Sequence, residues 1–371
     1  MTNEKTVREP LFHISKRDTL PWWKCWLIRI AAVFAALVLS SLLIIVLVKK
    51  NPVELYASIF NGNFGSGTKT WLTFQDTAIL LCIALAVTPA FKMKFWNIGA
   101  EGQVLAGCLA SAACVFYIGS SVPNWLLLVI MTVCAILAGA IWAVIPAVFK
   151  AIFNTNETLF TLMMNYIATF LIAFFLNKWV KSGSGTLGIL EDGHFPVIGD
   201  NPSLLTVLIV LFFAAAMFVY LKFSKHGYEI AVVGESVNTA KYAGINVKKV
   251  IIRTLILSGA LCGITGLLLV GAINHTLTTS LAGGRGFTAI MVSWLAKFNP
   301  LYMILTAFIV VFFQKGANQL ASDFPTLMTK DFGDIIVGII FLFIIGCEFF
   351  IGYAIKFRKR EKKEKTAEVT E

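Results

Sequence analysis

The sequence predicts an all-α membrane protein with about ten transmembrane helices. Hydrophobic residues fill 58% of its 371 positions and charged residues only 14%, and the mean hydropathy is +0.80. A soluble domain usually carries about 25% charged residues, so a water-soluble protein is excluded. The apolar residues also form runs of roughly 20, the length of a helix that crosses a bilayer, without the two-residue alternation of a β-barrel strand.

Ten apolar runs bounded by charges, Gly, Pro or Asn are the predicted spans. In chain order they are residues 27–48, 73–91, 98–118, 125–149, 157–176, 203–223, 250–273, 286–298, 301–314 and 333–355. The first run is too long for the core of a cleavable signal peptide, so it is predicted to be retained. The run 286–298 is short and glycine-flanked, which is typical of a half-span that is buried in protein or lines a water-filled cavity.

The basic residues predict how these spans are oriented. With alternating spans and a cytoplasmic N-terminus, 23 of the 31 Lys and Arg residues fall inside and 8 outside, the bias expected for cytoplasmic loops. Both termini are therefore predicted to be cytoplasmic. The predicted parts are an N-terminal tail (1–26), a transmembrane domain (27–355) with a polar segment (224–249), and a basic C-terminal tail (356–371). Because topology explains the net charge of +11, no nucleic-acid partner is required.

No motif for covalent chemistry is present in the sequence. The seven cysteines lie almost entirely within apolar runs and the four histidines in separate loops, so no metal site is predicted. A phosphate-binding loop, a zinc-protease helix and a serine-hydrolase elbow are all missing, so we expect no catalytic residues, no cofactor and no enzyme. Acids and bases are scarce within the spans, which argues against an ion-coupled secondary carrier of a small polar solute, the main alternative. Energy for transport is expected from another polypeptide.

Polar residues at the start of the third span are candidates for a substrate pathway. Asn97 and Glu101 are four residues apart and share a helix face, with Gln103 to one side. A carboxylate at membrane depth costs several kcal/mol unless it is paired or hydrated. The alternative is a glutamate at the cytoplasmic interface, solvated by headgroups or capping the helix. Asn165, deep in the fifth span, is either a pathway residue or a bond between helices.

A glycine-rich stretch before the short eighth run is a further pathway candidate. Three glycines surround Arg285, and Phe287 and Thr288 follow. This pattern predicts an irregular backbone at the outer face, and the alternative is an ordinary surface turn. The stretch 321–334 is predicted to be an outward acidic loop.

The polar segment 224–249 is longer than a connecting turn requires. Ser236 or Asn238 is predicted to cap a short helix that ends at Gly244. Because lysines and glutamates are nearly balanced there, docking to a soluble partner is favoured over binding to lipid headgroups. The candidate docking residues are Glu229, Gly234, Asn238, Lys241, Tyr242 and Gly244.

Four motifs in order resemble those of a known family. They are residues 95–103 (F-W-N-I-G-A-E-G-Q), 156–168 (N-E-T-L-F-T-L-M-M-N-Y-I-A), 227–245 and 286–300. The family comprises the permease subunits of bacterial ABC importers, in the branch of simple-sugar, ribose and nucleoside importers that is shared with branched-chain amino acid permeases. The chain is most similar to the nucleoside permeases. It departs from the family pattern at 235–238 (E-S-V-N, where x-N-P-x is usual) and at Lys241.

The resemblance implies the remaining expectations. A nucleoside or simple sugar would cross the bacterial plasma membrane through this multi-pass subunit, and ATP would be bound and hydrolysed by a separate ATPase. Residues 227–245 would sit in a groove of that ATPase. The partners would be the ATPase subunits, a second permease and an extracytoplasmic substrate-binding lipoprotein. The choice between a nucleoside, a sugar or another small polar solute, and between identical and different permeases, is left open.

Overall fold

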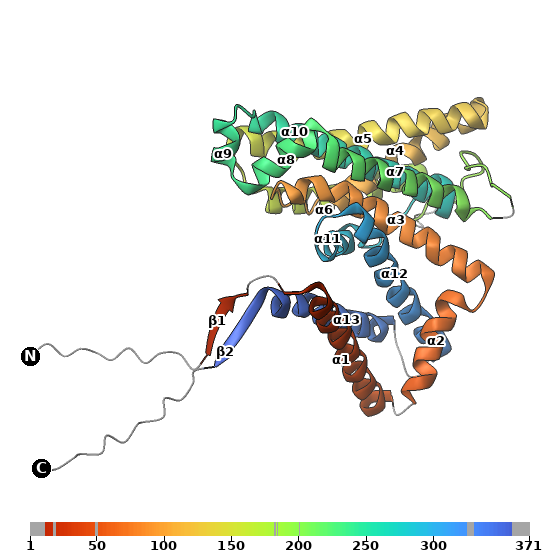
Figure 1. Ribbon diagram of the computed structural model, residues 1–371. Helices are drawn as coiled ribbons and strands as arrows, with labels where there is room; N and C mark the ends of the chain where they lie inside the picture. The colour runs from red at the N-terminus through yellow and green to blue at the C-terminus, as the bar shows by residue number, and fades with distance from the viewer. Residues whose placement is uncertain are drawn as a thin grey trace, which may run out of the picture. The chain divides into compact units, whose positions relative to one another are not determined.

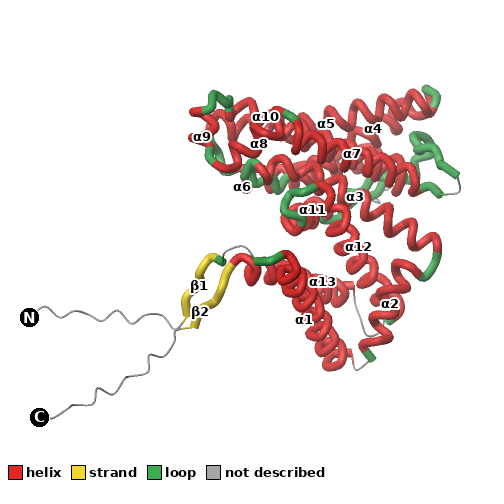
Figure 2. The backbone as a smooth tube through the Cα atoms, in the orientation of Figure 1, coloured by secondary structure: helices red, strands yellow, loops and turns green. Residues whose placement is uncertain are grey.

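The computed structural model describes residues 12–17, 20–48, 51–181, 183, 185–199, 201–324 and 330–357. The chain divides into two compact units, residues 59–316 and the flanking residues 1–58 with 317–371. Helices dominate both units (Figures 1 and 2). Eight helices of the described ranges are long and apolar enough to cross a membrane. The predicted all-α polytopic fold is confirmed.

The flanking unit is built from the two ends of the chain. Its elements are β1 (Phe12–Lys16), α1 (Trp22–Val48), the first part of α2 (Pro52–Phe64), the end of α12 (Pro300–Asp323), α13 (Lys330–Gly352) and β2 (Tyr353–Phe357). Helices α1 and α13 lie side by side (Figure 1). Arg29 of α1 forms an ion pair with Glu348 of α13, with an Nη2–Oε1 distance of 2.6 Å.

The antiparallel pairing of β1 and β2 was not predicted. Phe12 lies opposite Phe357 and Lys16 opposite Tyr353, so the last predicted span ends in a strand. The pairing brings the start of α1 and the end of α13 together, as two termini on one side of a membrane require. Which side that is stays a prediction. Most of the two predicted tails, residues 1–11 and 358–371, lies outside the described residues.

The central unit holds the remaining helices. They are the end of α2, α3 (Gly67–Lys92), α4 (Ala100–Ile118), η1 (Gly119–Ser121), α5 (Asn124–Phe153), α6 (Glu157–Trp179), α7 (Ser203–Phe223), α8 (Lys225–Glu235), α9 (Val237–Tyr242), α10 (Val247–Leu268), η2 (Leu269–Asn274), α11 (Arg285–Leu295) and the start of α12. Across the two units, each predicted span contains a helix. Helices α2 and α8 were missed, and the predicted acidic loop 321–334 is shorter because α12 continues to Asp323 and α13 begins at Lys330.

Helix α3 is the core of the central unit. Every residue from 77 to 91 is buried, and α7, α10 and α11 pack around the helix. A helix that is apolar on all sides can satisfy its whole surface only inside a protein or in lipid. The second predicted span is therefore the central helix of this unit, enclosed by α7, α10 and α11.

Glycines allow α10 to pack directly against α4 and α5. A β-carbon at Gly107 of α4 would lie 2.6 Å from the carbonyl oxygen of Gly263, and one at Gly266 would lie 2.5 Å from that of Val104. A β-carbon at Gly139 of α5 would meet the carbonyl oxygen of Gly259 of α10, and one at Gly259 would meet that of Gly139. Small residues permit such backbone contact between membrane helices. We call Gly107, Gly139, Gly259, Gly263 and Gly266 the glycine column.

Side-chain caps define where several helices begin. Asn156 accepts a hydrogen bond from Leu159 N at 3.2 Å and so starts α6. Asn246 starts α10 in the same way through Lys249 N, at 3.1 Å. Such caps satisfy one of the unpaired N–H groups of a first helical turn.

The connection between α6 and α7 folds back onto the end of α10. Leu187 N donates to Leu277 O at 3.0 Å and Leu190 N to His275 O at 2.8 Å. The rings of His194 and His275 are stacked, with centroids 4.0 Å apart. This loop is therefore fixed to the end of η2 by backbone bonds and by one imidazole pair.

Candidate functional site

The chain between α3 and α4 turns back into the central unit. Lys94 has a positive φ of 60°, and Phe95 N donates to Ala90 O at 2.9 Å. Asn97 Nδ2 then reaches Ser258 Oγ of α10 at 3.3 Å. At about 1.5 Å per residue, Ser258 lies roughly 16 Å from the start of α10. Residues 95–99 thus lead into the protein interior before α4 begins, and the cytoplasmic position expected for residues 95–103 stays a prediction.

Asn97 explains why the helix does not start earlier. Its Oδ1 accepts from Gly99 N at 3.1 Å, a turn in which the side chain replaces a backbone partner. The backbone of Ile98 is held by Thr161 of α6, whose Oγ1 accepts from Ile98 N at 3.2 Å. The segment 95–99 is non-helical backbone held partly by local bonds and partly by Thr161 and Asn165 of α6.

Three of the predicted pathway residues form a buried group that we call the amide cluster: Asn97, Gln103 and Asn165. Their side chains are 0%, 1% and 5% exposed. Asn165 Oδ1 accepts from Gly102 N at 2.8 Å, and its Nδ2 donates to Ile98 O at 3.0 Å. Gln103 Nε2 donates to Asn97 Oδ1 at 3.2 Å. These amides hold protein groups together, and their place in a substrate pathway stays a prediction.

Glu101 holds the start of α11, a partner that the sequence did not suggest. Its Oε1 accepts from Gly284 N and its Oε2 from Gly286 N, both at 2.7 Å. A carboxylate is favoured there by the positive end of the helix dipole. A β-carbon at Gly286 would lie 2.5 Å from Glu101 N, so only glycine fits. The expectations of a cytoplasmic Glu101 and an outer-face 282–286 cannot both hold, since the two segments are in contact.

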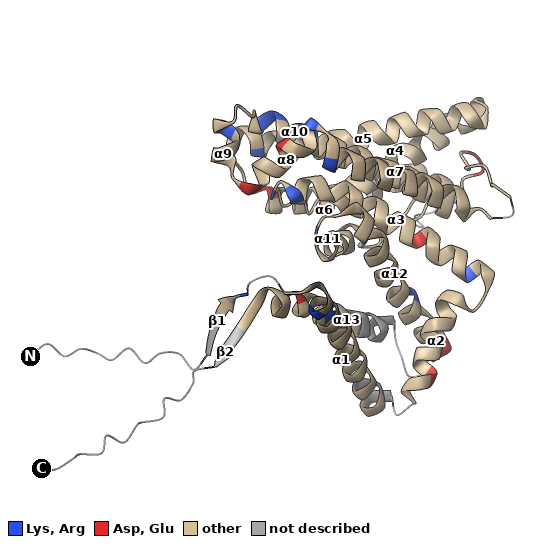
Figure 3. Ribbon diagram, in the orientation of Figure 1, with Lys and Arg blue, Asp and Glu red and all other residues tan. Residues whose placement is uncertain are grey.

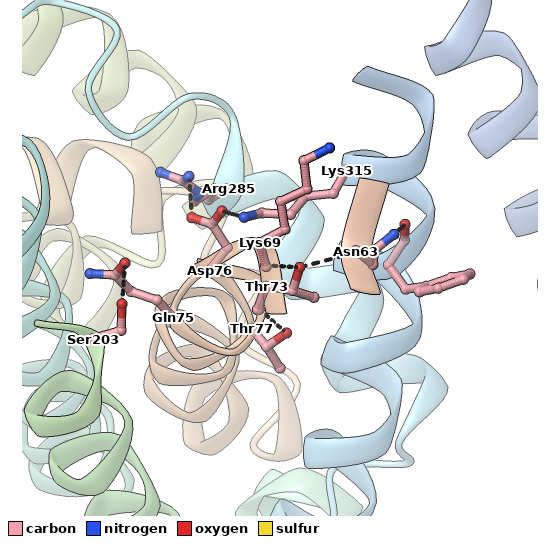
Figure 4. Close-up of polar contacts among 10 residues, drawn as sticks. Asn63, Lys69, Thr73, Gln75, Asp76, Thr77, Ser203, Arg285 and Lys315 are labelled. Atoms are coloured by element: carbon pink, nitrogen blue, oxygen red, sulfur yellow. Dashed lines mark hydrogen bonds and ion pairs between the residues drawn. The ribbon is translucent and has the colours of Figure 1, made fainter. Parts of the chain in front are cut away.

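A second group of charged side chains lies beside this contact, and sequence reasoning missed it. Arg285 Nη2 lies 3.0 Å from Asp76 Oδ1, and Lys315 Nζ lies 2.9 Å from Asp76 Oδ2 (Figure 4). We call Asp76, Arg285 and Lys315 the charged triad; it joins α3, α11 and α12. The available signal was Asp76 itself, the single acid between Glu54 and Glu101.

Other polar side chains on α3 point to different neighbours (Figure 4). Gln75 Oε1 accepts from Ser203 Oγ of α7 at 2.9 Å. Thr73 Oγ1 donates to Asn63 Oδ1 of α2 at 3.2 Å. Together with Asp76, they make one level of the central helix polar on several sides. The first residue of α11, Arg285, lies at the same level, since it pairs with Asp76.

Phe287 and Thr288, the other predicted pathway residues, follow Arg285 on α11. Phe287 is 46% exposed, whereas Thr288 Oγ1 donates to Gly284 O at 3.3 Å. Helix α11 has only 11 residues, so it cannot cross a bilayer alone. The expected half-span therefore corresponds to a short helix whose N-terminus lies within the protein.

The polar segment 224–249 forms two short helices. Ser236 caps α9 by accepting from Thr239 N at 3.3 Å, and Gly244 follows the helix with a φ of 76°. The prediction of a helix capped at Ser236 or Asn238 and ended by Gly244 is thus confirmed, with Ser236 as the cap. On α9 only Ala240 is buried, and Tyr242 is 94% exposed.

The remaining candidate docking residues divide between surface and interior. Asn238, Lys241 and Gly244 are exposed, and Glu229 is half-buried. Gly234 is buried against the end of α3, where an added β-carbon would meet the carbonyl oxygen of Lys92. Figure 3 shows Lys and Arg gathered at the end of the central unit that carries α8 and α9.

Three features are typical of a polytopic membrane permease. They are the central helix α3, the short helix α11 that begins inside the protein, and the charged end with the exposed helix α9. Among the described residues, no group of three His, Cys, Asp or Glu side chains could hold a metal ion. The chain belongs to the family described as the permease component of branched-chain amino acid transport systems, which matches residues 71–345. It is a permease subunit of an ABC importer and a multi-pass protein of the plasma membrane.

Relatives with named substrates share most of the chain. A guanosine ABC transporter permease (NupP) of Bacillus subtilis is 27% identical, over 84% of this chain and 89% of the relative. A glucose ABC transporter permease (TsgB13) of Haloferax volcanii is 27% identical, over 92% and 93%. A nucleoside ABC transporter permease (NupB) of Lactococcus lactis is 26% identical, over 81% and 85%.

Proposed function

We propose that this permease carries a neutral, hydroxyl-rich solute, a nucleoside or a simple sugar, into the cell. The observation that carries the proposal is that two acidic and two basic side chains balance each other at the N-terminus of α11. Glu101 and Asp76 face Arg285 and Lys315 there, and the carboxylates bind the backbone and the cations of the same unit. An anionic or cationic solute would be repelled by the charges of its own sign at this site. A neutral solute needs only hydrogen-bonding groups. Guanosine, glucose and nucleosides, named for the relatives, are neutral.

The energy is proposed to come from a separate ATPase that docks on α8 and α9. Tyr228 and Tyr242 are 66% and 94% exposed there, and exposed aromatic side chains are frequent anchors at protein interfaces. The contact of Gly234 with the end of α3 supplies a direct route from this surface to the central helix. ATP is bound by the partner, and the permease itself needs no cofactor or metal.

Two further partners complete the proposed importer. A second permease, identical or homologous, shares the substrate path, and an extracytoplasmic lipoprotein delivers the solute. Family membership supports both, since the relatives are named as components of ABC transporters.

Reconstitution of the complete importer tests this function. The permease, its ATPase, the second permease and the binding lipoprotein are placed in proteoliposomes, and uptake of labelled inosine and glucose is measured with ATP on the ATPase side. Uptake of one of them should require ATP and stop when the ATPase cannot hydrolyse it. Uptake that continues without hydrolysis and collapses when an ionophore dissipates ion gradients would instead establish the ion-coupled carrier.

A variant at the docking surface tests the coupling separately. Tyr242→Ala should abolish substrate-stimulated ATP hydrolysis by the assembled complex while the permease remains in the membrane. Tyr302→Ala is the matched control, because Tyr302 is also exposed, at 65%, but lies at the start of α12. Equal hydrolysis by both variants would contradict docking at α9.

A further inference from the structure

The charged triad has an unusual position for three ionised side chains. At about 1.5 Å per residue, Asp76 lies roughly 13 Å along α3 from its first residue, and Lys315 roughly 12 Å from the last residue of α12. Both helices are long and apolar enough to cross a membrane. Asp76 and Lys315 therefore lie about two turns inside the ends of their helices, close to the ends of the predicted spans 73–91 and 301–314.

The triad is also partly open. The side chains of Asp76, Arg285 and Lys315 are 27%, 31% and 21% exposed. Exposed charge at this depth is strongly disfavoured in hydrocarbon and is found where it faces a water-filled cavity or the inside of a bundle. The broken backbone at Gly283 and Gly284, with φ values of 61° and 74°, is likewise tolerated only beside protein or water. We therefore expect the exposed side of the triad to face water or protein and not hydrocarbon.

The chemistry of the triad suits hydroxyl groups. A hydroxyl both donates and accepts, and the triad offers an acceptor between two sets of donors. Among the bonds within the described residues, the Arg285 guanidinium donates one N–H group to Asp76, although it carries five donors. Two neighbouring hydroxyls can donate to the carboxylate while accepting from the guanidinium or the ammonium.

A charged solute fits the same place poorly. A phosphate would be attracted by Arg285 and Lys315 but repelled by Asp76 between them, and Glu101 adds a second negative charge at the start of α11. A cation meets the reverse arrangement. Like charges at close range are destabilising by several kcal/mol when poorly solvated.

We propose that Asp76, Arg285 and Lys315 form a subsite on the translocation path that binds paired hydroxyl groups of the neutral solute. This subsite rests on the proposed function, since it requires that the permease carries a hydroxylated solute. It assigns substrate contact to residues that sequence reasoning missed. The amide cluster, by contrast, is closed off from this surface by its burial.

Thiol labelling of the complete importer in membranes tests whether the triad faces water. Lys315→Cys should react with an impermeant, positively charged methanethiosulfonate, and a hydroxylated substrate should slow the reaction. Phe170→Cys is the matched control, because Phe170 is 71% exposed on the apolar face of α6, and it should not react above the wild type with its seven cysteines. Absence of labelling at Lys315→Cys, or equal labelling of Phe170→Cys, would overturn the proposal.

Transport of a matched pair of nucleosides tests the chemistry. In cells with the whole importer, the ratio of inosine to 2′,3′-dideoxyinosine uptake is measured for the wild type, Asp76→Asn and Lys315→Met. Because the same lipoprotein serves all three, a changed ratio comes from the permease. A site built to bind hydroxyls discriminates strongly against analogues that lack them, so we expect the ratio to fall about tenfold or more in the variants.

The outcomes separate the subsite from the function. Equal loss of both uptake rates at an unchanged ratio would make the triad a structural ion network and overturn the proposal. If the wild type imports neither nucleoside, the nucleoside assignment fails, and the labelling experiment with glucose as the protecting solute still decides whether the triad lies on the path.

Discussion

The amide cluster and the charged triad are both polar groups in an apolar unit, but their partners differ. Asn97 and Asn165 are buried and bind backbone groups of the segment 97–102. Within the described part of the chain, Asp76 pairs with side chains of two other helices, and all three members of its triad stay partly exposed. A polar residue whose partner is backbone stabilises an irregular segment, whereas charged side chains that meet at an open surface remain available to a ligand.

The largest effect is expected from removing the amide at Asn165. Asn165→Leu leaves Gly102 N–H and Ile98 C=O without partners, and each unpaired buried group costs about 1–3 kcal/mol. We expect little folded protein by fluorescence-detected size exclusion. Tyr166→Leu, a change at a 56% exposed neighbour, should be tolerated. Normal yield of Asn165→Leu would remove the distinction between the two groups.

The second prediction concerns the contact that joins them. Gly286→Ala places a methyl group 2.5 Å from Glu101 N, so α11 must shift or Glu101 must release it, at a cost of about 1–3 kcal/mol. A lowered melting temperature of the purified permease would show this. Gly338→Ala on α13 is the control, because nothing lies within 4 Å of the added carbon; equal shifts in the two variants would contradict the contact.

The third prediction asks whether the triad is needed for folding. Asp76→Asn should leave the amount of folded permease within about twofold of the wild type, since partly exposed ion pairs contribute little to stability. Transport in the same cells should nevertheless fall. If Asp76→Asn is lost from the membrane as completely as Asn165→Leu, the triad stabilises the fold in the same way as the amide cluster, and the proposed difference between them is wrong.

The smallest effect is expected from a region outside both groups. Burial and the neighbouring His194 lower the pKa of His275 below its usual value of 6.5. Below about pH 6.5 the unfolded chain then binds a proton that the folded chain does not. The free energy of unfolding therefore decreases as the pH is lowered, by at most about 1.4 kcal/mol per pH unit. The melting temperature of the permease, followed from pH 7.5 to 5.5, should fall less steeply in His275→Asn. Identical slopes would contradict the shift.

Much of the fold followed from composition and periodicity. Length of apolar runs is sufficient to locate spans, and even the half-span at 286–298 was visible from its glycines. The return of residues 95–99 to the protein interior was not, because it depends on Thr161 and Ser258, which lie far away in sequence. A capping asparagine such as Asn97 gives the same sequence pattern whether it lies at the membrane surface or inside the protein.

The candidate site was harder to predict than the fold. Asn97, Glu101, Gln103 and Asn165 stand out in the sequence as polar residues in an apolar chain. Their burial and the kind of partner they bind are tertiary properties, which the sequence does not show. Asp76 was overlooked because a single acid near the beginning of a span has the same pattern as an interfacial residue. Only the convergence of α3, α11 and α12 gives it its two cationic partners.

The glycine column has a mechanical consequence. Where backbones touch, there are no flexible side chains between them to absorb a displacement, so α4, α5 and α10 can be expected to turn as one piece. An opening for a solute then has to form at the margin of this block, where the N-terminus of α11 is bound to Glu101 of α4. The two N–H bonds to Glu101 would in that case be the hinge about which the permease changes its access.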